Sequence, residues 1–168
     1  GISNSAFTTV TIDVLPTNTA PTSVNDTYTT LEDTTLTVPA AGILTNDLDL
    51  DGDILSALLV ANVTNGVLNL NTNGGFTYTP NTNFNGTVVF SYTISDGTNT
   101  ANANVTVTIA AVNDAPVTVN NAYSLMKNAT LNIPATGILT NDIDVENNAL
   151  AALLVANVTH GTLSLNPN

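Results

Sequence analysis

The sequence has no cysteine and no tryptophan, and Lys127 is the only basic residue among its 168. Without cysteine no disulfide can stabilise the fold, so stability has to come from a packed core, a metal ion or neighbouring domains. Without clustered Lys and Arg the chain cannot neutralise phosphates, which argues against nucleic acid and an acidic membrane surface as partners.

Acidic residues are abundant by comparison. The chain has 13 of them and a formal net charge of -12, so it attracts cations. Hydrophobic residues make up 43% of the chain, enough for a folded core. No run of about 20 apolar residues occurs, so we expect no membrane insertion in this segment. Gly1 to Val10 lacks the charged start of a signal peptide, and any export signal is expected outside this sequence.

An internal repeat organises the chain. Residues 21–73 and 116–168 align without a gap at an offset of 95, with 29 identities in 53 aligned pairs. The block GILTND at 42–47 recurs at 137–142, and ALLVANVT at 57–64 recurs at 152–159. Such similarity at a fixed period indicates tandem structural modules.

The register of the repeat divides the sequence into three parts. Residues 1–19 are predicted to be the last strand and linker of a preceding repeat, 20–114 a complete repeat, and 115–168 the front half of the next. Both ends of the sequence fall inside a repeat, so an excerpt from a longer chain is expected.

Short alternating segments separated by turn residues predict an all-β fold, with about seven strands per repeat in an Ig-like, cadherin-like Greek-key sandwich. Dipeptides such as Asn65-Gly66 and Asp96-Gly97 are typical of hairpin turns. A single helical turn is predicted at 42–44. The strands are predicted at 25–30, 35–38, 55–63, 67–71, 76–79, 87–95 and 102–110.

Period-two spacing separates the core faces of the two longest strands from their solvent faces. It predicts that Val88, Phe90, Tyr92 and Ile94 share one face, and that Val105, Val107 and Ile109 share another. The same spacing favours a core role for the aromatic residues over a sugar-stacking platform.

The most specific local feature is the run NDLDLDGD at residues 46–53, in which Asp47, Asp49, Asp51 and Asp53 alternate with other residues. Calcium prefers six to eight oxygen ligands, and such a loop can wrap several carboxylates around one ion. The loop is not an EF-hand, because position 12 counted from Asp47 is Leu58 rather than Glu. A solvated acidic loop without metal is the alternative.

The repeat resembles the cadherin-like tandem repeats, about 95 residues long, of large bacterial surface adhesins. The resemblance covers essentially the whole chain, and its motifs are specific as a set although each is weak alone. They are NDAP at 113–116, Tyr28, EDT at 32–34, GILTND at 42–47, the acidic run at 49–53, FTYTP at 76–80, NFNG at 83–86 and FSYTISDG at 90–97.

This resemblance implies a structural bead in a long extracellular or cell-surface fibre, often with calcium near the domain junctions. By analogy, an early Glu, an Asp-x-Asp loop and an Asn-Asp linker converge between neighbouring domains. The matching residues are Glu32, Asp47 with Asp49, and Asn113 with Asp114.

The second copy departs from this acidic pattern. Asp142 and Asp144 remain and Glu146 replaces Asp51, but Asn147 and Asn148 replace Gly52 and Asp53. Fewer charges predict weaker calcium binding there. Thr19 replaces the Asp of the later linker, so the first junction is also predicted to bind poorly.

A spacer and adhesive segment is therefore the leading functional hypothesis, with neighbouring repeats and an unknown adhesion target as partners. The alternative is a subunit of an extracellular filament that assembles with like subunits by β-strand addition. A carbohydrate-binding module is the weakest candidate. An enzyme is not expected, because the lone His160 lies in a turn without convergent partners.

Overall fold

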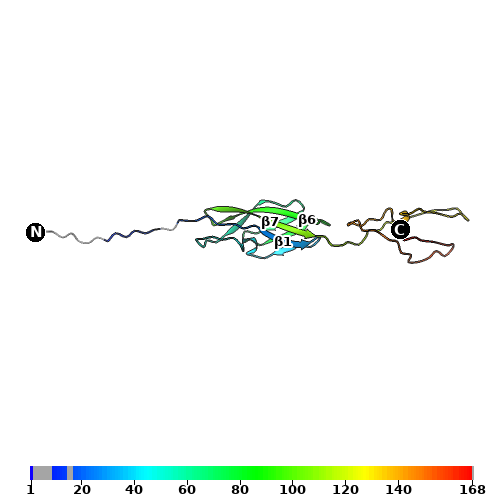
Figure 1. Ribbon diagram of the computed structural model, residues 1–168, viewed down its shortest axis with the longest axis horizontal. Helices are drawn as coiled ribbons and strands as arrows, with labels where there is room; N and C mark the ends of the chain where they lie inside the picture. Colours follow the sequence, from blue (N-terminus) through cyan, green and yellow to red (C-terminus); the bar gives the residue numbers. More distant parts are fainter. Residues whose placement is uncertain (2–8, 15–16, 168) are drawn as a thin grey trace. The chain divides into compact units, whose positions relative to one another are not determined.

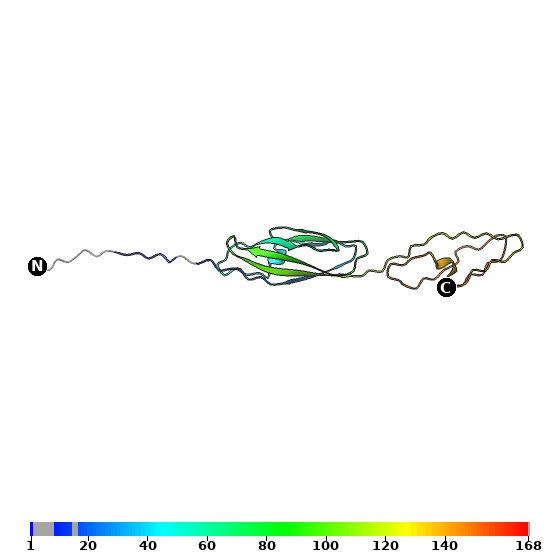
Figure 2. The ribbon, with the colours of Figure 1, turned by 90° about the horizontal axis from the view of Figure 1, so that it is seen from above.

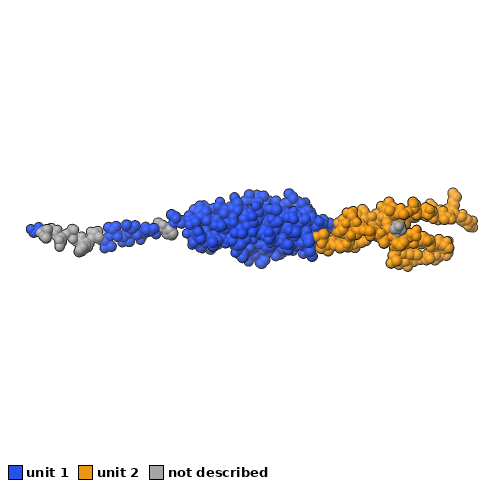
Figure 3. Space-filling model, in the orientation of Figure 1, with its two compact units in different colours: residues 1–110 blue, residues 111–168 orange. Residues whose placement is uncertain are grey.

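The computed structural model describes residues 1, 9–14 and 17–167. The chain separates into two compact units, residues 1–110 and 111–168 (Figure 3). The division of the sequence into repeats at 1–19, 20–114 and 115–168 remains a prediction.

The first unit contains one four-stranded sheet with the order β1-β7-β6-β3. Its central strands β6 and β7 form a long antiparallel hairpin, and β1 runs parallel to β7 beside it (Figure 1). The turned view shows the same hairpin lengthwise (Figure 2). The strands are β1 (Asp26–Leu31), β3 (Ser56–Ala61), β6 (Gly86–Ser95) and β7 (Thr100–Ala110).

A second sheet has three strands in the order β2-β5-β4 and is antiparallel throughout. A single 3-10 turn, η1 (Gly42–Leu44), follows β2 and buries Ile43. The strands of this sheet are β2 (Leu36–Val38), β4 (Gly66–Leu70) and β5 (Phe76–Pro80). The all-β sandwich of seven strands and the single helical turn predicted from the sequence are confirmed.

Alternating side chains of both sheets form the core, as the spacing predicts. The rings of Tyr28 and Phe76 meet edge to face at 5.2 Å between centroids, and those of Phe76 and Phe90 at 5.4 Å. Phe76, Tyr78, Phe90 and Tyr92 are buried in this core, and Phe84 packs against it from a half-buried position. The buried aliphatic residues include all of Val88, Ile94, Val105, Val107 and Ile109.

Close backbone contact joins η1 to the β4–β5 turn. The Ile43 amide donates to the Gly74 carbonyl at 3.1 Å. A Cβ on Gly74 would overlap the Ala41 carbonyl, and Gly74 has a φ of +82°. Glycine is therefore required there for both conformation and space.

The second unit contains no strand among residues 111–167, although the repeat predicts counterparts there of the four strands expected at 25–30, 35–38, 55–63 and 67–71, so that expectation is wrong. It has one 3-10 turn, η2 (Gly137–Leu139), and one isolated bridge between Val117 and Ile143. Within residues 1–19, where the last strand of a preceding repeat is predicted, residues 9–14 form no strand, and residues 2–8, 15 and 16 lie outside the described part of the chain.

Strand pairing explains this difference. In the first unit β1 pairs only with β7, β3 only with β6, and β2 and β4 only with β5. The front half of a repeat therefore contains no two strands that pair with each other. Residues 116–168 are counterparts of 21–73, so the described residues of the second copy include no counterpart of β5, β6 or β7.

Candidate functional site

The first acidic loop, residues 46–53, is tied to the segment that precedes β1. Thr22 and Leu48 exchange two backbone hydrogen bonds, of 2.8 and 3.0 Å. The Val24 amide donates to Asp47 Oδ1 at 2.8 Å. These contacts fix the loop at the start of the sandwich, where the linker from residue 17 onward enters.

Asp49 organises the interior of this loop. Its Oδ1 accepts the amides of Asp51 at 2.9 Å and Asp53 at 3.1 Å, and Gly52 between them has a φ of +80°. The other oxygen, Oδ2, is buried and accepts no hydrogen bond. A buried carboxylate oxygen without a donor is costly unless a cation or a proton compensates it.

The linker contacts the same loop, because the Thr19 amide donates to Asp51 Oδ2 at 2.5 Å. Asn18 is held separately, through its Nδ2 and Asp96 Oδ2 at 2.9 Å. One carboxylate of the acidic loop thus binds the backbone of the residue that leads into the repeat.

The second acidic loop, residues 141–148, repeats this arrangement at an offset of 95. Asp142 Oδ1 accepts the Val119 amide at 2.8 Å, and Asp144 Oδ1 accepts the Asn148 amide at 2.9 Å. Asn147 adopts a φ of +59° in place of Gly52. The loop therefore folds locally, even where the strands of the sandwich are absent.

The second linker contacts its loop in the same way. The Asp114 amide donates to Glu146 Oε2 at 3.1 Å, which is the counterpart of the Thr19–Asp51 contact. Asn148 Nδ2 donates to Asn113 Oδ1 at 2.7 Å. Glu146 Oε1 and Asn141 Oδ1 are buried and accept no hydrogen bond. The structure thus joins the Asp114 backbone to Glu146 directly, and Asn113 to Asp144 through Asn148.

Glu32 lies apart from the first acidic loop. It follows β1, is only 3% exposed, and donates its amide to the Ala110 carbonyl at 2.9 Å, beside the end of β7. Asn85 Nδ2 donates to its Oε2 at 3.4 Å. Since Asp47 binds the segment before β1, Glu32 and Asp47 belong to opposite ends of that strand.

A buried polar cluster around Tyr92 was missed by the sequence analysis. The Tyr92 hydroxyl lies 3.0 Å from Asp26 Oδ2, 3.2 Å from the Ile43 carbonyl and 3.4 Å from Asp47 Oδ2. Burial raises the pKa of Asp26 and of Asp47, and also that of the Tyr92 phenol, which both carboxylates raise further. The period-two pattern placed Tyr92 in the core but gave no sign of its hydroxyl partners.

One sequence difference between the two copies falls in this cluster. Asn121 stands in the second copy where the first copy has Asp26. Asn121 Nδ2 donates to the Ile138 carbonyl at 2.8 Å and to the Val119 carbonyl at 3.3 Å. Tyr92 reaches the corresponding carbonyls in the first copy. An amide donor thus does in one copy what the tyrosine hydroxyl does in the other.

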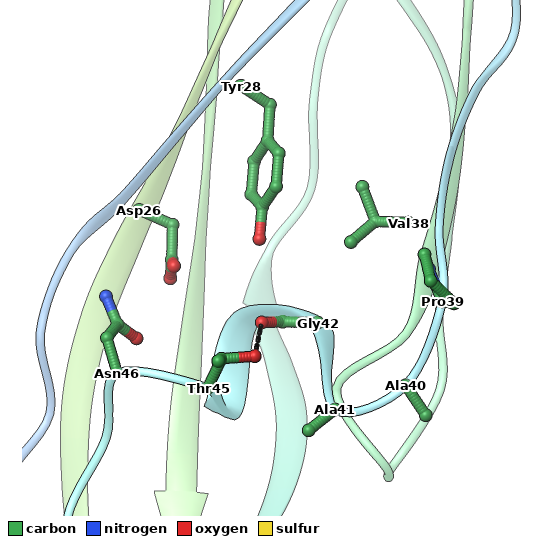
Figure 4. Close-up of a pocket in the computed structure, with 9 residues that line it drawn as sticks. All are labelled: Asp26, Tyr28, Val38, Pro39, Ala40, Ala41, Gly42, Thr45 and Asn46. Atoms are coloured by element: carbon green, nitrogen blue, oxygen red, sulfur yellow. Dashed lines mark hydrogen bonds between the residues drawn. The ribbon is translucent and has the colours of Figure 1, made fainter.

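An open cavity of about 410 Å³ lies beside this cluster, between β1, β2 and η1. Figure 4 shows Asp26, Tyr28 and Asn46 on one side and the chain from Val38 to Gly42 on the other. Asp26, which lines this cavity, also accepts a hydrogen bond from the Tyr92 hydroxyl.

The comparisons with known proteins place this geometry in a family. The model of the cadherin-like domain matches residues 17–110, which includes the linker, the first acidic loop and all seven strands. The chain belongs to the cadherin-like domain family. A search of curated proteins finds no match.

Among solved structures, the cadherin-like chain is similar to parts of endo-fucoidan hydrolases of glycoside hydrolase family 107. One variant matches with a TM-score of 0.40 and 17% identity over 59% of this chain, and a second structure with 0.36 and 20% over 56%. The chain spans only 15% and 13% of the length of those two proteins.

The cadherin-like loops fit calcium in the chemistry of their donors, since every candidate ligand is an oxygen and buried oxygens without donors occur in both copies. Among the described residues no three acidic or histidine side chains gather at one point. A calcium ion held here would therefore also draw on amide and carbonyl oxygens and on water.

No helix in the described part of the chain is long and apolar enough to cross a membrane.

Proposed function

We propose that this cadherin-like chain is an extracellular, non-catalytic spacer and adhesive segment of a longer surface fibre. The contact between linker and acidic loop carries the proposal, because Thr19 with Asp51 and Asp114 with Glu146 repeat it at an offset of 95. A linker anchored to the loop of the repeat that follows it has fewer orientations, which is what a spacer requires.

Calcium would be held by the acidic loops and their linkers. Its ligands in the first loop would come from Asp47, Asp49, Asp51 and Asp53, and in the second from Asn113, Asp114, Asp142, Asp144 and Glu146. The ion would neutralise clustered carboxylates and link linker to loop, adding stability that is lost on chelation. The first copy has more loop charge and the second has the acidic linker, so the two are expected to differ in affinity.

Thermal melting with and without calcium tests this assignment. We expect calcium to raise the melting temperature of the first unit and EDTA to reverse the rise. Asp49→Asn should abolish most of the rise, because it removes a charged oxygen that accepts no hydrogen bond. The matched control, Asp13→Asn, removes the same charge outside the loops and should keep it. An equal rise in the melting temperature of both variants would show that the effect of calcium does not depend on this loop.

The absence of catalysis and glycan binding is part of the same proposal. In the acidic loops Asp47 and Asp49 each accept a backbone amide through Oδ1, so both carboxylates have structural contacts within the loop and its neighbouring segment. A glycan array and an assay for release of reducing sugar from sulfated polysaccharides should both be negative. Reproducible hits would contradict a purely structural role.

End-to-end strand addition is the second candidate. Val10, Ile12 and Val14 correspond to Val105, Val107 and Ile109 of β7 and are 78%, 80% and 87% exposed, so this segment presents the apolar face of a last strand. Electron microscopy of the purified chain would show filaments that Ile12→Lys abolishes. Dispersed particles at every concentration would rule this candidate out.

A further inference from the structure

The first unit contains three Asn-Gly pairs, which differ in the contacts of the glycine amide. The pairs are Asn65-Gly66, Asn73-Gly74 and Asn85-Gly86. In such a pair the glycine nitrogen can attack the asparagine side chain, because glycine has no side chain of its own to obstruct the approach. The attack requires a nitrogen whose hydrogen is not already bonded, so the backbone contacts of the three glycines decide where it can occur.

The strand register leaves the Gly66 amide outside the ladder of its sheet. Gly66 lies opposite Pro80, and the Asn81 amide donates to the Asn65 carbonyl at 3.4 Å. In an antiparallel ladder this bond makes Gly66 and Pro80 a pair without mutual hydrogen bonds, so the Gly66 amide points away from β5. β4 is an edge strand of the three-stranded sheet. The ladder therefore supplies no acceptor for this amide.

The amide of Gly74 is held within the β4–β5 turn. It donates to the Asn71 carbonyl at 3.0 Å, and Gly74 itself is buried. Asn73 Oδ1 accepts the Gly75 amide at 3.1 Å. Both the nitrogen and the side chain that would have to react are fixed by other contacts.

The amide of Gly86 is held in the β6–β7 ladder. The Asp96 amide donates to the Asn99 carbonyl at 3.3 Å, and from this turn hydrogen-bonded pairs alternate with unbonded pairs along the two strands. The register is unbroken, which makes Gly86 and Ile109 a hydrogen-bonded pair. Of the three Asn-Gly pairs, the first is thus the one whose glycine nitrogen is free to react.

The carbonyl of Asn65 has a second donor. The Tyr78 hydroxyl, on a buried side chain, donates to it at 2.6 Å, in addition to the Asn81 amide. When the Gly66 nitrogen loses its proton, negative charge spreads through the peptide bond onto this oxygen. Donors directed at an oxygen where charge develops stabilise that charge. The contacts of Asn65 therefore favour the acidity of the nitrogen that attacks.

We propose that Asn65 is a site of spontaneous deamidation, at which the folded chain forms aspartate and isoaspartate without an enzyme. The Gly66 nitrogen attacks Cγ of Asn65 and loses its proton, the bond from Cγ to Nδ2 breaks, and ammonia leaves with that proton. Water then opens the resulting succinimide ring at either of its two carbonyl groups. The product has an added carboxylate, and isoaspartate also lengthens the backbone by a methylene beside Tyr78 and Asn81.

The second copy of the repeat cannot react in this way, because His160 stands before Gly161 where the first copy has Asn65. The reaction goes beyond the spacer function, since it would change the first sandwich irreversibly with time and leave the second copy unchanged. It involves neither the acidic loops nor their linkers.

Peptide mass mapping of the 168-residue chain during storage at neutral pH tests the proposal. Deamidation replaces an amino group by a hydroxyl, which changes the peptide mass, and isoaspartyl methyltransferase labels the isoaspartate. In the native chain we expect Asn65 to react at least about tenfold faster than Asn73 and Asn85, because their glycine amides react only after local opening. In urea the three rates should converge.

Variants separate the effect of the fold from that of the sequence. Tyr78→Phe should slow the reaction of Asn65 about tenfold in the native chain, as expected for one lost hydrogen bond to a developing charge, and should not change the rate in urea. Tyr28→Phe is the matched control and should change neither rate. Asn65→His, which installs the residue of the second copy, should remove the fastest mass change.

A native rate at Asn65 no higher than the rates at Asn73 and Asn85 would overturn the proposal. So would an unchanged native rate in folded Tyr78→Phe. If that variant does not fold, the comparison of native and urea rates in the natural chain decides the question.

Discussion

Tyr92 shows how one side chain can serve both the core and a polar contact. Its ring is fully buried, and its hydroxyl has one proton for four neighbouring oxygens, of Val24, Asp26, Ile43 and Asp47. The Val24 amide also donates to Asp47 Oδ1, but the four oxygens share the one hydroxyl proton, and this shortage of donors favours a protonated carboxyl.

Removal of this hydroxyl should therefore be costly. Tyr92→Phe removes the hydroxyl that the Ile43 carbonyl and the Asp26 and Asp47 carboxylates share, and we expect a loss of about 1 to 3 kcal/mol in the free energy of unfolding. Urea denaturation measures it. Tyr28→Phe is the control, since it removes a phenol hydroxyl for which no hydrogen bond is found among the described residues. Equal losses in the two variants would contradict a special role for Tyr92.

The same cluster gives stability a dependence on pH. Burial raises the pKa of Asp26 above its ordinary 3.8, so between the two values the native state binds more protons than the unfolded state. Its contribution is fully present below pH 3.8 and is lost as the pH rises through the folded-state pKa. Asp26→Asn should therefore reduce the stability gained on acidification from pH 7 to pH 4.

Urea denaturation at the two pH values tests this dependence on Asp26. Asp13→Asn is the control for general charge repulsion in a chain with a net charge of -12. A gain in Asp26→Asn as large as in that control would contradict the assignment.

Among the elements, the close contact between η1 and the β4–β5 turn depends on Gly74. Gly74→Ala adds a side chain that overlaps the Ala41 carbonyl, in addition to the strain of a positive φ. Gly52→Ala is the matched control, because Gly52 has nearly the same φ, +80°, but nothing near its Cβ. We expect Gly74→Ala to lower the free energy of unfolding by at least about 2 kcal/mol more than Gly52→Ala, measured in urea.

Alternating residues predicted the seven strands of the first unit within a few residues, because that pattern reports which segments can bury one face. The same pattern failed at 115–168, because pairing needs partners that alternation does not identify. In the acidic loops, residue type identified candidate ligands but gave no sign of the backbone amides that they accept. The position of Glu32 beside Ala110 follows from the parallel register of β1 and β7, which the sequence does not reveal.

A chain extended with a copy of residues 74–110 after Asn168 should complete the second sandwich, since these residues supply the partner of every front strand. Far-UV circular dichroism should show added strand content, and amide exchange at 153–155 should slow. Unchanged exchange there would mean that the second copy cannot fold even with its partners.

Over the whole molecule, two features occur together. The chain has a high negative charge, and both copies of the repeat have a contact between linker and acidic loop. Thirteen acidic residues against one basic residue make the chain repel itself, and four carboxylates of the first unit lie within seven residues. Cations should relieve this repulsion most where linker and loop meet.

Small-angle scattering of the 168-residue chain, in calcium and in EDTA at the same ionic strength, shows whether calcium stiffens this chain. If calcium holds the linkers to the acidic loops, the maximum dimension in calcium is larger and more sharply defined than in EDTA, and Asp49→Asn with Glu146→Gln reduces the difference. Identical scattering in both conditions would contradict the claim that calcium stiffens this chain.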